Sequence, residues 1–124
     1  MAVIAVQTEL VGRVQGEVIL HTWPNLGPGD TGEPVMLEHM GDRTVQAYGT
    51  FGAGTVSFEG TLETSGAPAH FATLTDPQGN DLTFTGTPTE RVEAVTELVY
   101  QIRPNASAGV TSVTAKMLMR KTIR

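Results

Sequence analysis

From Thr44 onward, apolar and polar side chains alternate with a period of two, and glycine or proline interrupts the pattern about every ten residues. In the segment 55–63, TVSFEGTLE, Val56, Phe58 and Leu62 share one side, and threonine, serine and glutamate share the other. Successive side chains of a β-strand point to opposite faces, so this alternation is typical of a half-buried strand. About six short strands with Gly and Pro at the joints predict an all-β fold, either an antiparallel β-sandwich or a jelly-roll-like barrel.

The other strands are expected at 44–51, 70–76, 81–86 and 110–124. In the last of these, Leu118 falls on the otherwise polar face, which predicts that this strand is covered on both sides near its end.

The segment 91–104, RVEAVTELVYQIRP, fits two patterns. Its valines can form a helical stripe, but β-branched residues together with Tyr100 favour an extended chain. We expect a helical turn between Glu90 and Ala94, followed by a strand that ends at Pro104.

Residues 1–43 differ in character from the rest of the chain. After some alternation they continue as HTWPNLGPGDTGEP, which is too rich in Gly and Pro to form a helix. The sequence therefore predicts an irregular Gly/Pro-rich N-terminal arm or loop over 1–43, part of or packed on the same domain as a β-sandwich core at 44–124. Such arms and loops are often in contact with partners, and a disordered loop is the alternative.

Charge and composition exclude several classes of protein. The net charge is -5, and the 8 Lys and Arg residues form no run, which argues against a nucleic-acid partner. The absence of cysteine excludes disulfides, thiolate zinc sites and a cysteine nucleophile, and it fits assembly in a reducing cytoplasm. No apolar stretch reaches the roughly 18 residues of a membrane span. The first residues lack the features of a signal peptide, so we expect them to belong to the mature protein.

The stretch LTDPQGNDLTF at 74–84 resembles a metal loop because three oxygen-bearing side chains lie close together. It lacks the alternating ligands, distant Glu and flanking helices of a calcium loop. A turn accounts for its residues instead: Asp76 accepts from backbone N–H groups further on, Pro77 has a preset φ, and Gly79 relieves the exit. With an alternating run on either side, we expect a β-hairpin whose structural turn is Asp76, Pro77 and Gly79.

None of the remaining candidate residues indicates a catalytic site. The glycines at 49, 52 and 54 lack the Lys-Ser/Thr pair of a phosphate loop, and no nucleophile elbow is present. The histidines are candidate metal ligands and the paired carboxylates are candidate acid–base groups: His21, His39, His70, Glu59 with Glu63, and Glu93 with Glu97. The histidines lack metal-ligand spacing, which leaves only a zinc site across a subunit boundary, and Glu59 and Glu63 are expected on a solvated strand face. We expect a non-enzymatic protein with no catalytic, cofactor-binding or metal site.

Four residues are candidates for contact with a partner: Trp23, Asn25, Leu26 and Arg103. Trp23, the only tryptophan, lies in the Gly/Pro-rich segment, and it either closes one end of the core or anchors a partner. Arg103 precedes Pro104, which holds its backbone extended. An ion pair from Arg103 to Glu97, to Asp76 or to another subunit is expected.

Residues 49–121 resemble a known group of proteins. The shared features are the segments GTFGAGTVSFEGTLE, FATLTDPQGNDLTFTG and YQIRPN, followed by an apolar strand that ends in RK. The resemblance rests on Gly54, Thr55, Val56, Glu59, Gly60, Leu74, Asp76, Gly79, Leu82, Phe84, Ile102, Arg103 and Pro104. Small structural proteins of tailed bacteriophages, of the capsid decoration (cement) type, are similar in these segments.

This resemblance implies a β-sandwich virion protein that binds the major capsid protein on the outer capsid surface and stabilises contacts between capsid subunits. It implies synthesis in the host bacterial cytoplasm, assembly as a homotrimer, and no nucleic-acid or membrane partner. The acidic charge is compatible with the outside of a capsid, because packaged DNA would repel it. The alternative is a tail or fibre-associated β-sandwich module that binds host-surface carbohydrate, and it requires an exposed aromatic platform.

Overall fold

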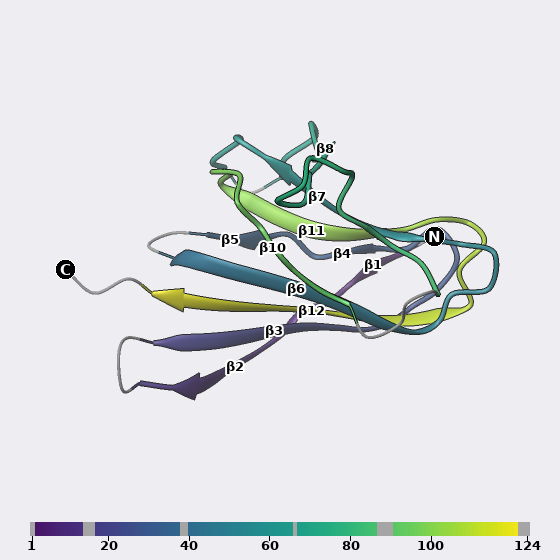
Figure 1. The fold of residues 1–124 in the computed structure, drawn as a ribbon, viewed down its shortest axis with the longest axis horizontal. Coiled ribbons are helices and arrows are strands. Elements are labelled where there is room, and N and C mark those ends of the chain that lie inside the picture. The colour runs from purple at the N-terminus through teal and green to yellow at the C-terminus, as the bar shows by residue number, and fades with distance from the viewer. Residues whose placement is uncertain (1, 14–16, 38–39, 66, 87–90, 122–124) are drawn as a thin grey trace.

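The computed structural model describes residues 2–13, 17–37, 40–65, 67–86 and 91–121 of the 124-residue chain. Within these ranges the regular structure is β-strand throughout, and the strands form two sheets that pack face to face (Figure 1). The prediction of an all-β sandwich is confirmed. In the described ranges no helix is long and apolar enough to cross a membrane.

The first sheet is antiparallel and has five strands in the order β10-β6-β12-β3-β2. These are β2 (Gln7–Gly12), β3 (Val18–Leu26), β6 (Met40–Thr50), β10 (Val92–Ala94) and β12 (Ser112–Lys121). The C-terminal strand β12 lies between β6 and β3, with Leu118 opposite Thr44 on one side and opposite Leu20 on the other. Long strands from both ends of the chain therefore form the centre of this sheet.

The second sheet has seven shorter strands around the antiparallel pair of β7 and β11. Its strands are β1 (Val3–Ile4), β4 (Thr31–Gly32), β5 (Val35–Met36), β7 (Val56–Thr61), β8 (Ala72–Thr73), β9 (Thr83–Phe84) and β11 (Gln101–Ala106). β1 pairs with β4 in parallel, and β8 and β9 both pair with β7.

Period-two alternation places one face of each long strand in the core. On β12, alternate side chains from Val113 to Met119 are buried, whereas Leu118 points to the opposite face and is 41% exposed. The expectation that this strand is covered on both sides near its end is thus not met within one chain.

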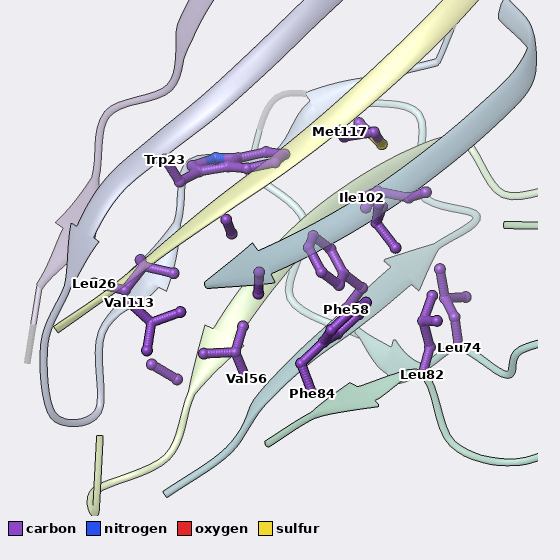
Figure 2. Packing of buried hydrophobic residues seen from close by; sticks show 14 of the residues in the cluster. Trp23, Leu26, Val56, Phe58, Leu74, Leu82, Phe84, Ile102, Val113 and Met117 are labelled. Atoms are coloured by element: carbon purple, nitrogen blue, oxygen red, sulfur yellow. The ribbon is translucent and has the colours of Figure 1, made fainter. Parts of the chain in front are cut away.

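An aromatic row fills the space between the sheets (Figure 2). Trp23 packs edge-on against Phe58 with ring centroids 6.4 Å apart, and Phe58 packs in the same way on Phe84 at 5.7 Å. The Trp23 indole N–H donates to the carbonyl of Glu33 at 2.9 Å, so its one polar group is satisfied in the core.

Trp23 and Leu26 are fully buried. Trp23 therefore has the core role of the two left open for it, and Leu26 is a core residue in place of the expected partner contact. The physical reason is a β-bulge in β3: register with β12 shifts between Val113 and Ala115, and Asn25 adopts a left-handed φ of 55°. The extra residue turns Leu26 inward as well as Trp23.

The N-terminal region has more regular structure than the expected irregular arm. Its segment 18–26 forms β3, a strand with paired neighbours on both sides in the five-stranded sheet. Between Val92 and Ala94 the chain is strand rather than helical turn, because the segment pairs with β6 and gains a ladder there. β11 also continues past Pro104 to Ala106. Glu90 and His39 lie outside the described residues.

His21 is a buried titratable group on the inner face of β3. Its Nδ1 lies 2.9 Å from the hydroxyl of Thr8 on β2, and within the described part of the chain its Nε2 has no hydrogen-bond partner. Burial lowers the pKa of His21 from its ordinary 6.5, because the charged ring would lose its hydration.

We predict that acidification weakens the fold through His21. Because its folded pKa lies below the unfolded value, its contribution to stability is fully present above about pH 6.5 and is lost as the pH falls toward the folded pKa. Urea unfolding of the wild type should shift to lower midpoints between about pH 7.5 and about pH 5.5. The His21→Leu variant should show a shallower slope over the same range, and equal slopes would contradict the assignment.

Gly32 packs directly against the Trp23 ring. A Cβ at this position would lie 2.5 Å from both Trp23 Cδ1 and Pro104 Cδ, and both rings are packed in place. Gly32→Ala should therefore lower the free energy of unfolding by about 1–3 kcal/mol, the usual cost of overpacking a core.

Gly86 provides the matched control for this prediction, because a Cβ there would meet only ordinary contacts with Phe51 at 3.8 Å or more. Gly86→Ala should leave the unfolding free energy within about 0.5 kcal/mol of the wild type. Denaturant titrations measure both unfolding free energies. Equal changes for the two substitutions would contradict the prediction that Trp23 leaves no room for a side chain at Gly32.

Candidate functional site

The turn at Asp76 uses its carboxylate for backbone contacts. Oδ1 of Asp76 accepts from the N–H of Gln78 at 3.0 Å and of Asn80 at 2.9 Å, and the N–H of Gly79 donates to the Asp76 carbonyl at 2.9 Å. Gly79 has a φ of 88°, which favours glycine. The geometry is that of a hairpin corner, and the described residues contain no group of three or more His, Cys, Asp or Glu that could hold a metal ion.

Arg91 connects this corner to the other sheet. Its Nε donates to Glu93 Oε2 at 2.6 Å, and its NH1 donates to the Thr83 carbonyl at 2.9 Å. A longer contact of 3.4 Å joins NH2 to Asp76 Oδ2, and the guanidinium lies 4.9 Å from the centre of the Phe84 ring. Because Thr83 and Phe84 belong to β9 and Glu93 belongs to β10, Arg91 holds the two sheets together along one side.

Arg103 has a different partner from those expected. Its Nε donates to Glu59 Oε1 at 2.7 Å, directly across the β7–β11 ladder, and Asn105 Nδ2 donates to Glu59 Oε2 at 3.3 Å. The guanidinium stacks 3.8 Å from the centre of the Phe71 ring. Glu59 is buried, which corrects its expected solvated position: Arg103, which stacks on Phe71, and Asn105 both contact its carboxylate.

The carboxylates of the candidate acid–base pairs have different hydrogen-bond partners. Glu63 Oε1 accepts from the N–H of His70 at 2.7 Å and of Ala69 at 3.0 Å, and the His70 N–H bond is the main reason that the pKa of Glu63 is lowered. Glu97 Oε2 instead accepts from the N–H and hydroxyl of Thr75, both at 2.9 Å. Each of these carboxylates thus has a local role in holding a loop.

Of the four predicted partner contacts, Asn25 alone is exposed. Trp23 and Leu26 lie in the core, and Arg103 is occupied by Glu59 and Phe71. A contact surface for a partner must therefore include residues that the sequence did not single out.

One such surface is the outer face of the five-stranded sheet. Register places on it Gln7, Glu9, Val18, Leu20, Thr22, Asp42, Thr44, Gln46, Tyr48, Val92, Ala94, Thr114, Lys116, Leu118 and Arg120. Three of its apolar side chains are exposed in the single chain: Tyr48 at 39%, Leu118 at 41% and Val92 at 57%. Leu118 was the one sequence signal for this face, because it interrupts a polar row.

Two surface hollows accompany these features. One, of about 230 Å³, lies at the end of the outer face and is lined by Val18, Asp42, Arg43, Thr44, Leu118, Met119 and Arg120. The other, of about 470 Å³, lies beside β8, and its rim includes the highly exposed Leu62 and Leu98.

The Arg103–Glu59 pair gives a stability prediction. Arg103→Gln leaves the buried Glu59 carboxylate without its charged donor, and it should lower the free energy of unfolding by about 2–3 kcal/mol. The double variant Arg103→Gln/Glu59→Gln removes the buried charge as well and should recover part of that loss. Urea titrations of the wild type, both single variants and the double variant measure the coupling, and purely additive effects would contradict it.

No protein-family model matches this chain, and no curated protein does. Among solved structures, the SPBc2 prophage-derived protein YomS is similar at 13% identity and a TM-score of 0.61, over 90% of this chain and 98% of that one. An RmlC-like cupin protein from Desulfovibrio desulfuricans is similar at 11% identity and a TM-score of 0.42, over 96% and 85%. KdgF from Halomonas sp. follows at 10% identity and a TM-score of 0.37, over 93% and 80%. At such identities, the likeness to YomS shows that the two chains share a fold.

Proposed function

We propose that this protein is a bacteriophage virion protein of the head decoration (cement) type. It binds the major capsid protein on the outer capsid surface and stabilises contacts between capsid subunits. The observation that carries the proposal is the likeness to YomS, a prophage-derived protein, over almost the whole of both chains. The resemblance of residues 49–121 to phage decoration proteins supports the same conclusion from the sequence.

The arrangement of polar residues supports a structural role. Asp76, Glu59, Glu63, Glu93 and Glu97 each hold a turn, a loop or an ion pair. Their carboxylates are committed to the fold, which suits a stiff module that acts by binding.

The charge and surface of the chain suit the outside of a capsid. A net charge of -5 would be repelled by packaged DNA. Many copies on a lattice bind through multivalency, so each contact can be modest. Exposed Asn25 and the outer face of the five-stranded sheet supply contact area that the buried Trp23 and Leu26 do not.

Binding to heads tests this proposal. Purified protein should cosediment with emptied phage heads that lack it, saturate at a fixed number of copies per head, and raise the temperature at which the heads break open. Tails from the same phage serve as the control.

Binding to tails but not heads, or to glycans on an array, would favour the tail or fibre alternative. That alternative needs an aromatic platform, and burial of Trp23 removes one of its candidate members. A protein that binds neither heads nor tails would overturn the proposal of a virion role.

A further inference from the structure

The outer face of the five-stranded sheet carries exposed apolar side chains in the single chain, among them Leu118, Tyr48 and Val92. Leu20 and Leu118 lie side by side on β3 and β12, Thr44 and Ala94 continue their row on β6 and β10, and Glu9 ends it on the β2 edge. Val92 lies in the neighbouring row beside Gln46. A row of this kind on a sheet is typical of a face that another layer covers.

The charges on this face are balanced, unlike those of the whole chain. Register places two cations, Lys116 and Arg120, and two anions, Glu9 and Asp42, on it, a sum of zero. The chain as a whole has 13 acidic and 8 basic residues. A surface that meets its own copy repels itself when it carries a net charge, so a balanced face inside an acidic chain fits self-association.

The strand register makes the face complementary to itself. A two-fold axis that runs along the strands between β6 and β12 brings each residue of one strand over its register partner in the second copy. Leu118 then faces Thr44 of the second copy, Lys116 faces Gln46, and Arg120 faces Asp42. In β3 and β10, on either side of this central pair, Leu20 faces Ala94. Like charges do not meet at these positions.

We propose that two copies of this chain associate face to face through the outer faces of their five-stranded sheets. Leu118 of each copy lies over Thr44, one of the residues that line the hollow of about 230 Å³ in the other. Sheets that stack in this aligned way cross at about 30°, which keeps the central pairs in contact. This inference rests on the face alone and stands independently of the proposed virion role.

The available area fits a weak, reversible contact. In this arrangement four strands of each copy overlap, β10, β6, β12 and β3. At a spacing of about 4.8 Å, over at most seven residues that each rise about 3.3 Å, they give a face of at most about 440 Å² per copy. Two such faces bury up to roughly 900 Å² together, slightly below the size of a stable specific interface, so a dimer that dissociates readily on dilution is expected.

Sedimentation velocity of the purified full chain over a dilution series is the first test. The wild type should change from dimer to monomer as it is diluted, and Leu118→Asp should be monomeric throughout. Leu98→Asp is the matched control, because Leu98 is 87% exposed and lies away from this face. It should associate as the wild type does.

A pair of charge variants keeps the proposal testable even if Leu118→Asp fails to fold. Arg120 and Asp42 are both more than half exposed, so substitutions there do not disturb the core. Arg120→Asp gives a face with two acidic residues at this pair, and Asp42→Arg gives one with two basic residues. Each variant alone should be monomeric, and an equimolar mixture should form a heterodimer, which the ion pair within one chain would not produce.

A wild type that is monomeric at every concentration would overturn the proposal. A trimer would also overturn it. So would a dimer that persists in Leu118→Asp but is lost in Leu98→Asp. Failure of the two charge variants to associate when mixed would also count against it. Head binding by the monomeric variants would show that the virion role survives without this contact.

Discussion

Burial of Trp23 between the two sheets is the contact on which most of the structure depends. The ring packs edge-on against Phe58, donates its N–H to the Glu33 carbonyl, and leaves no room for a Cβ on Gly32. It therefore joins the long strand β3 to the seven-stranded sheet at several points. The bulge at Asn25 extends this arrangement by turning Leu26 into the same core.

Polar contacts add to the apolar core in holding the strands together. Arg91 joins β9 to β10 across the open side of the sandwich, and Arg103 is held between Glu59 and Phe71 on the outside of the seven-stranded sheet. Several acidic side chains of the protein thus form ion pairs or hydrogen bonds within the chain. The outer face of the five-stranded sheet is left with balanced charge and exposed apolar groups, and this division underlies the proposed contact between copies.

The sequence predicted features whose causes are local. Alternation identified the strands after Thr44, and the Asp-Pro-x-Gly pattern identified the corner at Asp76, because a turn depends on neighbouring residues. β3 was missed because Pro24 and Gly27 suggest a loop, whereas pairing with β2 on one side and with β12, some ninety residues later, on the other makes the segment a strand. The Arg103–Glu59 pair joins residues 44 positions apart, and nothing in the sequence distinguishes it from a pair with Asp76 or Glu97.

The position of β12 between β6 and β3 has a consequence for how the chain folds during synthesis. Its neighbours β3 and β6 are translated earlier but do not pair with each other, because β12 lies between them. The centre of the five-stranded sheet can close only after β12 has been translated, and contacts so distant in sequence form slowly. Until then the nascent chain exposes two unpaired strand edges and the future core. Truncation before β12 (Ser112–Lys121) would remove the middle of a sheet, so such a product should be a target for proteases and chaperones.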